Sequence, residues 1–183
     1  MTESIRSLIK NAPSEAYSGQ RSKFRSGDIF AQSHGSWESW NGIKILGVRI
    51  VTLSTYSHVG VIEVGKDGRM YAVEAVQPEA RRIYLSEIGP FYHLPIEQAD
   101  WTAVTDYKVA EAIGTPYSQF DAIRAYFKPL PKGCMTECAA LTREVLMAAG
   151  VDLGPLSRPD SVVQRALELG SSLTYVHKVP EKV

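Results

Sequence analysis

The sequence predicts a single α+β domain over residues 1–183. Two β-rich runs, "YSHVGVIEV" at 56–64 and "MYAVEAV" at 70–76, flank the turn-rich link "GKDGR" and predict an antiparallel hairpin. The segment "TECAALTREVLMAAG" at 136–150 has the clearest helical periodicity in the chain. A length of 183 residues, 44% of them hydrophobic, fits one ordinary globular domain with a substantial core.

The first part of the chain predicts one short strand between less regular segments. Residues 1–27 mix Ser, Lys, Arg and Gly, and we expect a helix followed by a loop there. "GDIFAQS" at 27–33 then predicts a strand introduced by Gly27 and Asp28. Residues 36–55 carry apolar side chains at helical spacing and also between those positions, which favours a buried helix.

The link between the two β-rich runs predicts a register for the hairpin. A three-residue loop over 66–68, with Gly68 in the left-handed conformation, would place His58 opposite Val76 and Gly60 opposite Glu74. His58 and Glu74 then share a face as diagonal neighbours, with Cβ atoms roughly 7 Å apart or less. A two-residue loop would put them on opposite faces, so the register decides whether they meet.

Further elements follow the hairpin. "RRIYLSEI" at 81–88 predicts another strand, and "FYHL" at 91–94 is expected to be extended. The pattern of 103–113 is helical, and 118–127 predicts a short helix or turn before "KPLPKG" breaks the chain. The expected apolar side of the 103–113 helix consists of Val104, Tyr107, Val109 and Ile113.

The helix predicted over 136–150 has signals at both ends. Thr136 is the expected amino-terminal cap, and Gly150 lies where a helix normally stops. A Pro-containing loop and a helix are expected over 154–170, followed by a closing strand at 172–179. The expected buried face consists of Cys138, Leu141, Val145, Leu146 and Ala149.

Composition excludes several classes of protein. The 20 Lys and Arg residues balance 20 Asp and Glu residues, so the overall charge predicts no nucleic-acid partner. The first ten residues lack the apolar core of a secretory signal, and no uninterrupted apolar stretch is long enough to cross a bilayer. We therefore expect no integral membrane segment and a cytoplasmic location by default, with delivery to a cell wall by another route left open.

The two cysteines are the most informative chemical groups in the chain. Cys134 and Cys138 form neither a disulfide framework nor the four-ligand pattern of structural zinc, so we expect reduced thiols and no metal or other cofactor. Cys138 lies in the first turn of its predicted helix, where backbone amides and the helix dipole favour a thiolate. The same amides would stabilise an oxyanion, with roughly 3 kcal/mol per donor in other enzymes.

A nucleophilic thiolate needs a partner that keeps it ionised and later protonates a leaving group. Imidazole suits this role at neutral pH, and His58 is the candidate base. Glu74, on the same predicted face, is the candidate acceptor that fixes the imidazole tautomer. Small residues nearby, Gly60 and Ala72 among them, would leave room for a helix terminus to approach the sheet. The reaction class is acyl transfer through a thioester on Cys138.

Several short motifs follow one another along the chain: "GDIF", "SHVGVIEV", "VEA", "TPYSQFDAI", a cysteine helix ending in "AAGVDL", and "SRPDSV". Their succession resembles that of the circularly permuted NlpC-type papain-like hydrolases, the YiiX/YebB-like group, in which His precedes Cys. The resemblance covers roughly residues 26–165. It implies a papain-like fold with a central antiparallel sheet and the cysteine-bearing helix packed against it.

The resemblance also implies roles for four residues. The catalytic cysteine falls on Cys138, the histidine on His58 and the polar third residue on Glu74, while Tyr117 in "GTPYSQF" resembles a position near the cleft. Ser and Glu commonly follow the cysteine in the family, whereas two alanines follow it here. The implied activity is that of a thiol-dependent hydrolase, amidase-like or peptidase-like, or an acyltransferase. The implied substrates are peptides, peptidoglycan stem peptides or acylated lipids.

Other interpretations of these residues stay open. A non-catalytic binding or structural module would retain the papain-like cleft without turnover, and the two alanines after Cys138 favour it. Cys134, Cys138 and a histidine would bind zinc in another interpretation. His177 is a rival base because it follows the cysteine, as in unpermuted papain-like enzymes, although we expect it to be structural.

Simpler roles are also available for several charged residues. Glu74 would pair with Arg81 or Arg82 instead of orienting a histidine. Asp28 is expected to satisfy loop amides, and His93 to lie at the surface or in a loop.

Overall fold

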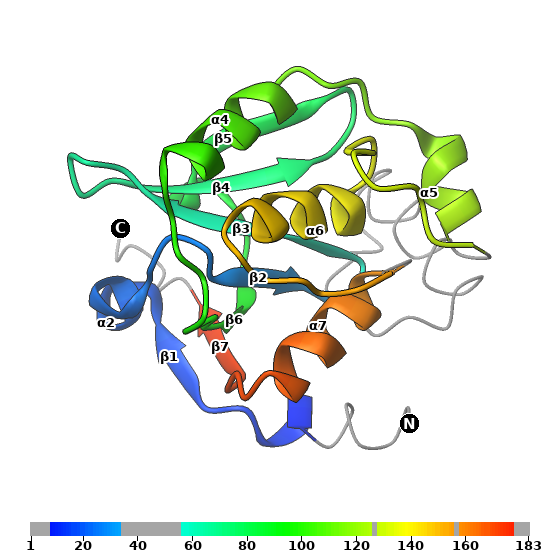
Figure 1. Ribbon diagram of the computed structural model, residues 1–183. Helices are drawn as coiled ribbons and strands as arrows, with labels where there is room; N and C mark the ends of the chain where they lie inside the picture. The colour runs from blue at the N-terminus through cyan, green and yellow to red at the C-terminus, as the bar shows by residue number, and fades with distance from the viewer. Residues whose placement is uncertain (1–7, 34–55, 126–127, 156–157, 178–183) are drawn as a thin grey trace.

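The computed structural model describes residues 8–33, 56–125, 128–155 and 158–177 (Figure 1). Within these ranges, the protein is built on a seven-stranded sheet in the order β1-β7-β6-β2-β3-β4-β5. Neighbouring strands are antiparallel except β1 and β7, which run parallel. The predicted α+β class is confirmed, with a mixed sheet in place of a purely antiparallel one. The helix expected over 36–55 lies outside the described residues.

Most strands lie where the sequence predicts them. The strand expected over 81–88 ends at Tyr84, because the chain turns into a short 3-10 helix, η2, that buries Leu85. The sequence did not predict β1, which is extended because it pairs with β7. The strands are β1 Ser14–Ala16, β2 Ile29–Gln32, β3 His58–Val64, β4 Met70–Ala75, β5 Ala80–Tyr84, β6 Phe91–Leu94 and β7 Thr174–His177.

Helices cover the sheet at the positions that the periodicity predicts. Figure 1 shows α6 and α7 lying across one face of the sheet, with α5 beside the start of α6. The amide of Ser118, just before α5, donates to the carbonyl of Thr136 at 2.9 Å, which ties α5 to that start. The helices are α2 Tyr17–Gln20, η1 Arg21–Lys23, η2 Leu85–Glu87, α4 Ala103–Ala112, α5 Gln119–Ala125, α6 Cys138–Ala148 and α7 Pro159–Glu168.

The β3–β4 hairpin has the predicted register. Val61 pairs with Val73, and the amide of Gly65 donates to the carbonyl of Arg69 at 2.7 Å. Gly68 has a φ of 74°, the left-handed conformation that the three-residue loop requires. Because side chains alternate along a strand, this register fixes which residues of the two strands share a face.

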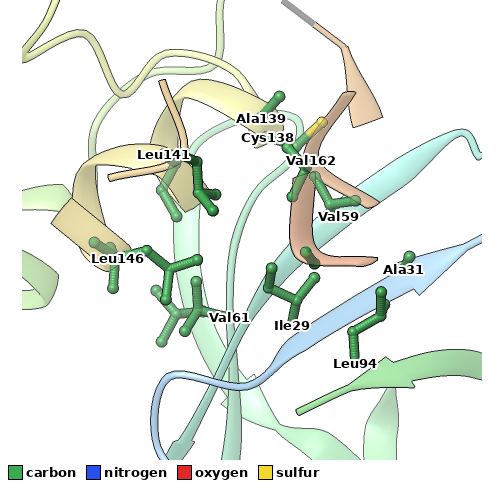
Figure 2. Close-up of a cluster of buried hydrophobic side chains, with 14 of the residues drawn as sticks. Ile29, Ala31, Val59, Val61, Leu94, Cys138, Ala139, Leu141, Leu146 and Val162 are labelled. Atoms are coloured by element: carbon green, nitrogen blue, oxygen red, sulfur yellow. The ribbon is translucent and has the colours of Figure 1, made fainter. Parts of the chain in front are cut away.

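Alternate side chains of β3 enter two hydrophobic clusters on opposite faces of the sheet. Val59 and Val61 belong to the larger cluster, to which α4, α6 and α7 contribute (Figure 2). Ile62 belongs to a second cluster, with Phe24 and Phe30. Burial of each such aliphatic or aromatic side chain contributes about 1.5–3 kcal/mol, so the larger cluster fixes α6 against β3.

The helix α4 confirms the predicted element but not its predicted face. Val104 and Tyr107 are 66% and 72% exposed, whereas Thr105, Val109 and Ala112 are buried. Ile113 is also exposed, at 39%, so the apolar-side prediction is wrong for three of its four residues and right for Val109. The reason is tertiary, because α4 packs against α6 and small side chains such as Thr105 and Ala112 allow two helices to approach closely.

Candidate active site

The first residue of β3, His58, meets Glu74 of β4. Nε2 of His58 lies 2.7 Å from Oε2 of Glu74. The two residues are the diagonal neighbours that the hairpin register predicts, and their side chains are 15% and 3% exposed. Because Nε2 is engaged by Glu74, Nδ1 is the ring nitrogen that can face a further partner.

Arg81 of β5 holds the other oxygen of the same carboxylate. Its Nε and Nη2 donate to Oε1 of Glu74 at 2.8 and 2.7 Å, while Arg82 pairs with Glu63. The expected ion pair with arginine and the expected bond to His58 therefore both exist, one on each oxygen. Burial alone would raise the pKa of Glu74, but its bonds to His58 and Arg81 lower that pKa below its usual value.

The side chain of Cys138 lies close enough to His58 to affect the pKa of the imidazole. Burial by itself lowers the pKa of an imidazole, but the bonds to Cys138 and Glu74, and the charges of both, raise the pKa of His58 to about 10. The ring is therefore held in its protonated form at neutral pH, with both nitrogens as donors. The structure brings Cys138, His58 and Glu74 together.

The Phe30 ring packs against the ring of His58. Phe30 pairs with Gly60 across β2 and β3, and a Cβ on Gly60 would lie 2.5 Å from the Phe30 ring. The ring centroids of Phe30 and His58 are 5.9 Å apart in an edge-on arrangement. The expectation that Gly60 leaves room for a helix terminus is therefore wrong, because an aromatic ring fills that space and α6 packs on the opposite face.

Cys138 begins α6 at the margin of the larger hydrophobic cluster. Figure 2 shows its sulfur at the edge of the group, beyond Val59 and Val162. In Figure 1, β3 and α6 both begin on the side of the molecule where α5 lies. The first residue of the helix, Cys138, can therefore lie near the first residue of the strand, His58. Cys138 is only 7% exposed, as a small core residue would be, but its contact with His58 distinguishes it from one.

The residue that caps α6 is Glu137, and the prediction of Thr136 is wrong. The Glu137 carboxylate accepts the amide of Ala139 at 2.9 Å and also that of Ala140. Its extended backbone, with φ −145° and ψ 165°, leaves Thr136 one residue outside the helix. The hydroxyl of Thr136 instead donates to Asp121 of α5 at 2.9 Å.

This cap reduces the number of free amides at the helix start. The side chain of Glu137 binds the amides of Ala139 and Ala140, and its carbonyl accepts that of Leu141 at 2.9 Å. No acceptor for the amide of Cys138 is found among the described residues. Of the amides expected to stabilise an oxyanion, the one that remains is therefore that of Cys138.

Tyr117, the candidate substrate contact, packs against the larger hydrophobic cluster, to which Cys138 also belongs. Burial and then the negative charges of Cys138 and Glu137 raise the pKa of Tyr117, so its hydroxyl stays neutral. Its backbone amide donates to the carbonyl of Pro78 at 2.9 Å, which anchors the segment before α5.

Cys134 occupies the loop before α6, with its sulfur 3.2 Å from the hydroxyl of Thr136. Within the described ranges, no group of three His, Cys, Asp or Glu side chains is placed to hold a metal ion. The zinc interpretation of Cys134 and Cys138 therefore lacks a ligand cluster in this part of the chain.

His93 is buried, so its expected surface position is wrong. It lies in β6 with Nε2 2.8 Å from Oδ2 of Asp28. Asp28 also accepts the amides of Arg25 at 2.8 Å and Ile96 at 3.1 Å, which confirms that it satisfies loop amides. His93 is buried because β6 is an interior strand of the sheet, between β7 and β2.

His177, the rival base, lies in β7 opposite Ala16. Two strands, β6 and β2, separate β7 from β3, which carries His58. The structure thus brings Cys138 to the histidine that precedes it in the chain and not to the one that follows it.

Sequence reasoning missed the positions of two charged groups at this site. The signal for Glu137 was its place immediately before the first helical residue, but the preference of helix caps for Thr pointed to its neighbour. Arg81 was expected only as an alternative to His58 as the partner of Glu74. The hairpin register could not place it beside His58, because Arg81 lies in β5, outside the β3–β4 hairpin.

No protein family matches the chain, and no curated protein matches it either. Across the described ranges, no helix has the length and apolar character needed to span a bilayer. A functional assignment therefore depends on the geometry of Cys138, His58 and Glu74.

Proposed function

We propose that the protein is a thiol-dependent hydrolase that cleaves an amide or ester through a thioester on Cys138, with His58 as the base and Glu74 orienting it. The observation that carries this proposal is the hydrogen-bonded chain from His58 through Glu74 to Arg81, with the side chain of Cys138 close enough to His58 to affect its pKa. A nucleophile next to a base that is itself held by a third group is the usual arrangement in covalent catalysis.

In the acylation step, the Cys138 thiolate attacks the carbonyl carbon of the substrate. A C–S bond forms, and the carbonyl electron pair moves to oxygen, where the amide of Cys138 donates a hydrogen bond. The His58 imidazolium then gives its proton to the leaving nitrogen or oxygen as the scissile bond breaks. The products are a free amine or alcohol, a thioester on Cys138 and a neutral imidazole.

Water completes the reaction in the deacylation step. Neutral His58 takes a proton from water while the water oxygen attacks the thioester carbon, and the C–S bond breaks to release a carboxylic acid. Cys138 and His58 return to the thiolate and imidazolium pair. An amine or alcohol that replaced water in this step would give an acyltransferase by the same chemistry.

Glu74 gives His58 its orientation throughout both steps. Its Oε2 accepts a hydrogen bond from Nε2, which leaves Nδ1 as the ring nitrogen that can face the sulfur. The bond to Glu74 also stabilises the imidazolium, which must form again in every turnover.

The proposal extends to the class of fold and substrate. A circularly permuted papain-like domain of the NlpC type is supported by the chain order, in which a hairpin with His58 precedes a helix that begins at Cys138. The substrates expected for such a domain are peptides, peptidoglycan stem peptides or acylated lipids. Tyr117, which packs against the same hydrophobic cluster as Cys138, is the proposed contact for the group next to the scissile bond.

Alkylation by iodoacetamide tests the proposal. At neutral pH, Cys138 should react at least about tenfold faster than Cys134, because an imidazolium holds its thiolate. His58→Ala should remove most of this advantage, and His177→Ala should leave it unchanged. Equal, slow labelling of both cysteines, or equal effects of the two histidine variants, would contradict the assignment.

A binding module without turnover is the second candidate function. The burial of Cys138, which is 7% exposed among apolar side chains, favours it. Hydrolysis of p-nitrophenyl acetate by wild type and Cys138→Ser separates the two functions. Equal rates, together with a Cys138 that resists alkylation, would support the binding module.

A further inference from the structure

The helix α5 has its small side chains on the inside and its large apolar side chains on the outside. Ala125 is buried and packs with Ala140 of α6. Phe120 and Ile123 are instead 74% and 64% exposed, and they share one side of the helix because they lie three residues apart. This is the reverse of the usual arrangement, in which the apolar side of a surface helix faces the core.

Hydrogen bonds fix this orientation of α5. The amide of Ser118 donates to the carbonyl of Thr136 at 2.9 Å, and the hydroxyl of Thr136 donates to the Asp121 carboxylate at 2.9 Å. The acidic group of α5 therefore points toward the segment before α6, and a rotation that buried the apolar pair would break these bonds. Figure 1 shows α5 at the outer margin of the fold, beside the start of α6.

Three cations accompany the exposed apolar pair. Arg124 of α5, and Lys128 and Lys132 in the loop after it, are all exposed. Within the described ranges, none of the three forms an ion pair. Arg124 lies four residues after Phe120 and therefore on the same side of the helix. The chain as a whole has no net charge, so this excess of positive charge is local.

We propose that α5 and the loop after it dock the protein on an anionic lipid surface. Phe120 and Ile123 enter the headgroup region, and the three cations contact the anionic headgroups. An exposed apolar pair alone fits many kinds of partner, but apolar side chains beside uncompensated Lys and Arg complement a surface that is both apolar and anionic. The inference goes beyond the proposed function, because it concerns a surface and not the reaction of the thiol.

The helix α4 provides a matched control. Val104 and Tyr107 also lie three residues apart and are exposed to a similar extent. However, α4 carries two acidic residues and one cation, and that cation, Lys108, pairs with Glu111 at 2.8 Å. This helix therefore exposes an equivalent apolar pair without an excess of positive charge.

Co-sedimentation of the full chain with lipid vesicles tests the proposal. Vesicles of phosphatidylcholine alone are compared with vesicles that also contain about 30% phosphatidylserine. At a salt concentration of about 0.05 M, the protein should bind the anionic vesicles at least about tenfold more tightly than the neutral ones. Most of this preference should disappear at about 0.5 M salt, because salt screens the attraction between exposed charges.

Three double variants separate the apolar and charged contributions. Phe120→Ser with Ile123→Ser should weaken binding to the anionic vesicles by about tenfold or more. Arg124→Gln with Lys128→Gln should weaken it by roughly fivefold per charge and reduce its dependence on salt. Serine at both exposed apolar positions of α4 should leave binding unchanged. Because all the substituted side chains are exposed, each variant should remain folded, and thermal unfolding checks this.

Other occupants of this surface give different results. Equal binding to the two kinds of vesicle, or an equal loss in the α4 variant, would overturn the proposal. Binding to a poly-glutamate peptide without binding to vesicles would assign the surface to an acidic protein and would overturn it as well. A dimer seen by sedimentation velocity without lipid, and lost in the Phe120→Ser and Ile123→Ser variant, would assign the surface to a second copy of the chain and would also contradict lipid docking.

Discussion

The guanidinium of Arg81 donates two hydrogen bonds to Oε1 of Glu74, from Nε at 2.8 Å and from Nη2 at 2.7 Å. The other oxygen of this carboxylate lies 2.7 Å from Nε2 of His58. The orientation of the imidazole therefore depends on a residue of β5, two strands away in the sheet.

Removing the Arg81 guanidinium should slow the reaction of Cys138. We expect Arg81→Gln to reduce its alkylation rate at neutral pH by roughly tenfold, because an outer partner fixes the carboxylate that orients the base. Arg82→Gln is the matched control, since Arg82 is on the same strand but pairs with Glu63. Equal rates for the two variants would show that Arg81 contributes only surface charge.

Stability should depend on pH through His58. Its pKa is raised from 6.5 to about 10, so the folded protein binds this proton more tightly than the unfolded chain does. The resulting stabilisation is complete below about pH 6.5 and is lost as the pH rises toward 10. We expect the free energy of unfolding to fall by roughly 1–3 kcal/mol over this range, and by less in His58→Gln. Urea unfolding at a series of pH values measures both slopes, and identical slopes would contradict the prediction.

Gly60 should not tolerate even one added methyl group. A Cβ there would lie 2.5 Å from the Phe30 ring and 2.6 Å from the carbonyl oxygen of Val73, and backbone cannot easily move. We expect Gly60→Ala to lower the free energy of unfolding by about 2 kcal/mol or more and to slow alkylation of Cys138, because Phe30 supports His58.

Gly89→Ala is the control for Gly60→Ala. An added Cβ at Gly89 would meet the side-chain nitrogen of Gln32 at 3.7 Å, which is an ordinary contact. Denaturant unfolding should show a change below about 1 kcal/mol for this variant. A similar loss in both variants would mean that the packing of Phe30 is not the cause.

Arg143 holds the loop before α6 against that helix. Its buried guanidinium pairs with Glu144 at 2.8 Å and donates to the carbonyls of Leu130 at 2.9 Å and Pro131 at 2.7 Å. Arg143→Met would leave the Glu144 carboxylate buried without a cation, and we expect a loss of about 3–5 kcal/mol in stability. Adding Glu144→Gln should recover part of that loss in urea unfolding, and a double variant no more stable than the single one would contradict this explanation.

The contact between His58 and Glu74 could be predicted because it depends on local chemistry. Gly68 permits the left-handed conformation that closes a three-residue loop, and the length of that loop fixes the pairing register of β3 and β4. Side chains alternate between the two faces of a sheet along each strand. The length of the loop therefore decided that these two side chains share a face.

The wrong predictions, for His93, for the buried side of α4 and for the cap of α6, concern features that the local sequence does not determine. His93 has its partner, Asp28, 65 residues away, and the rotation of α4 depends on how it packs against α6. The cap of α6 depends on a long Glu137 side chain folding back onto two amides, which statistical preferences for short caps do not favour. The meeting of Cys138 with His58 was expected from the partner that a thiolate needs and from the order and spacing of the motifs, because no local structure links the two residues.

The pairing of β1 with β7 has a consequence for the timing of folding during synthesis. Among the described strands, β1 joins the sheet through β7. Because β7 is the last of the described strands, residues 14–16 emerge from the ribosome long before the strand that will bind them. The native β1–β7 pairing can therefore form only after translation has passed residue 177, when the other described strands have already been made.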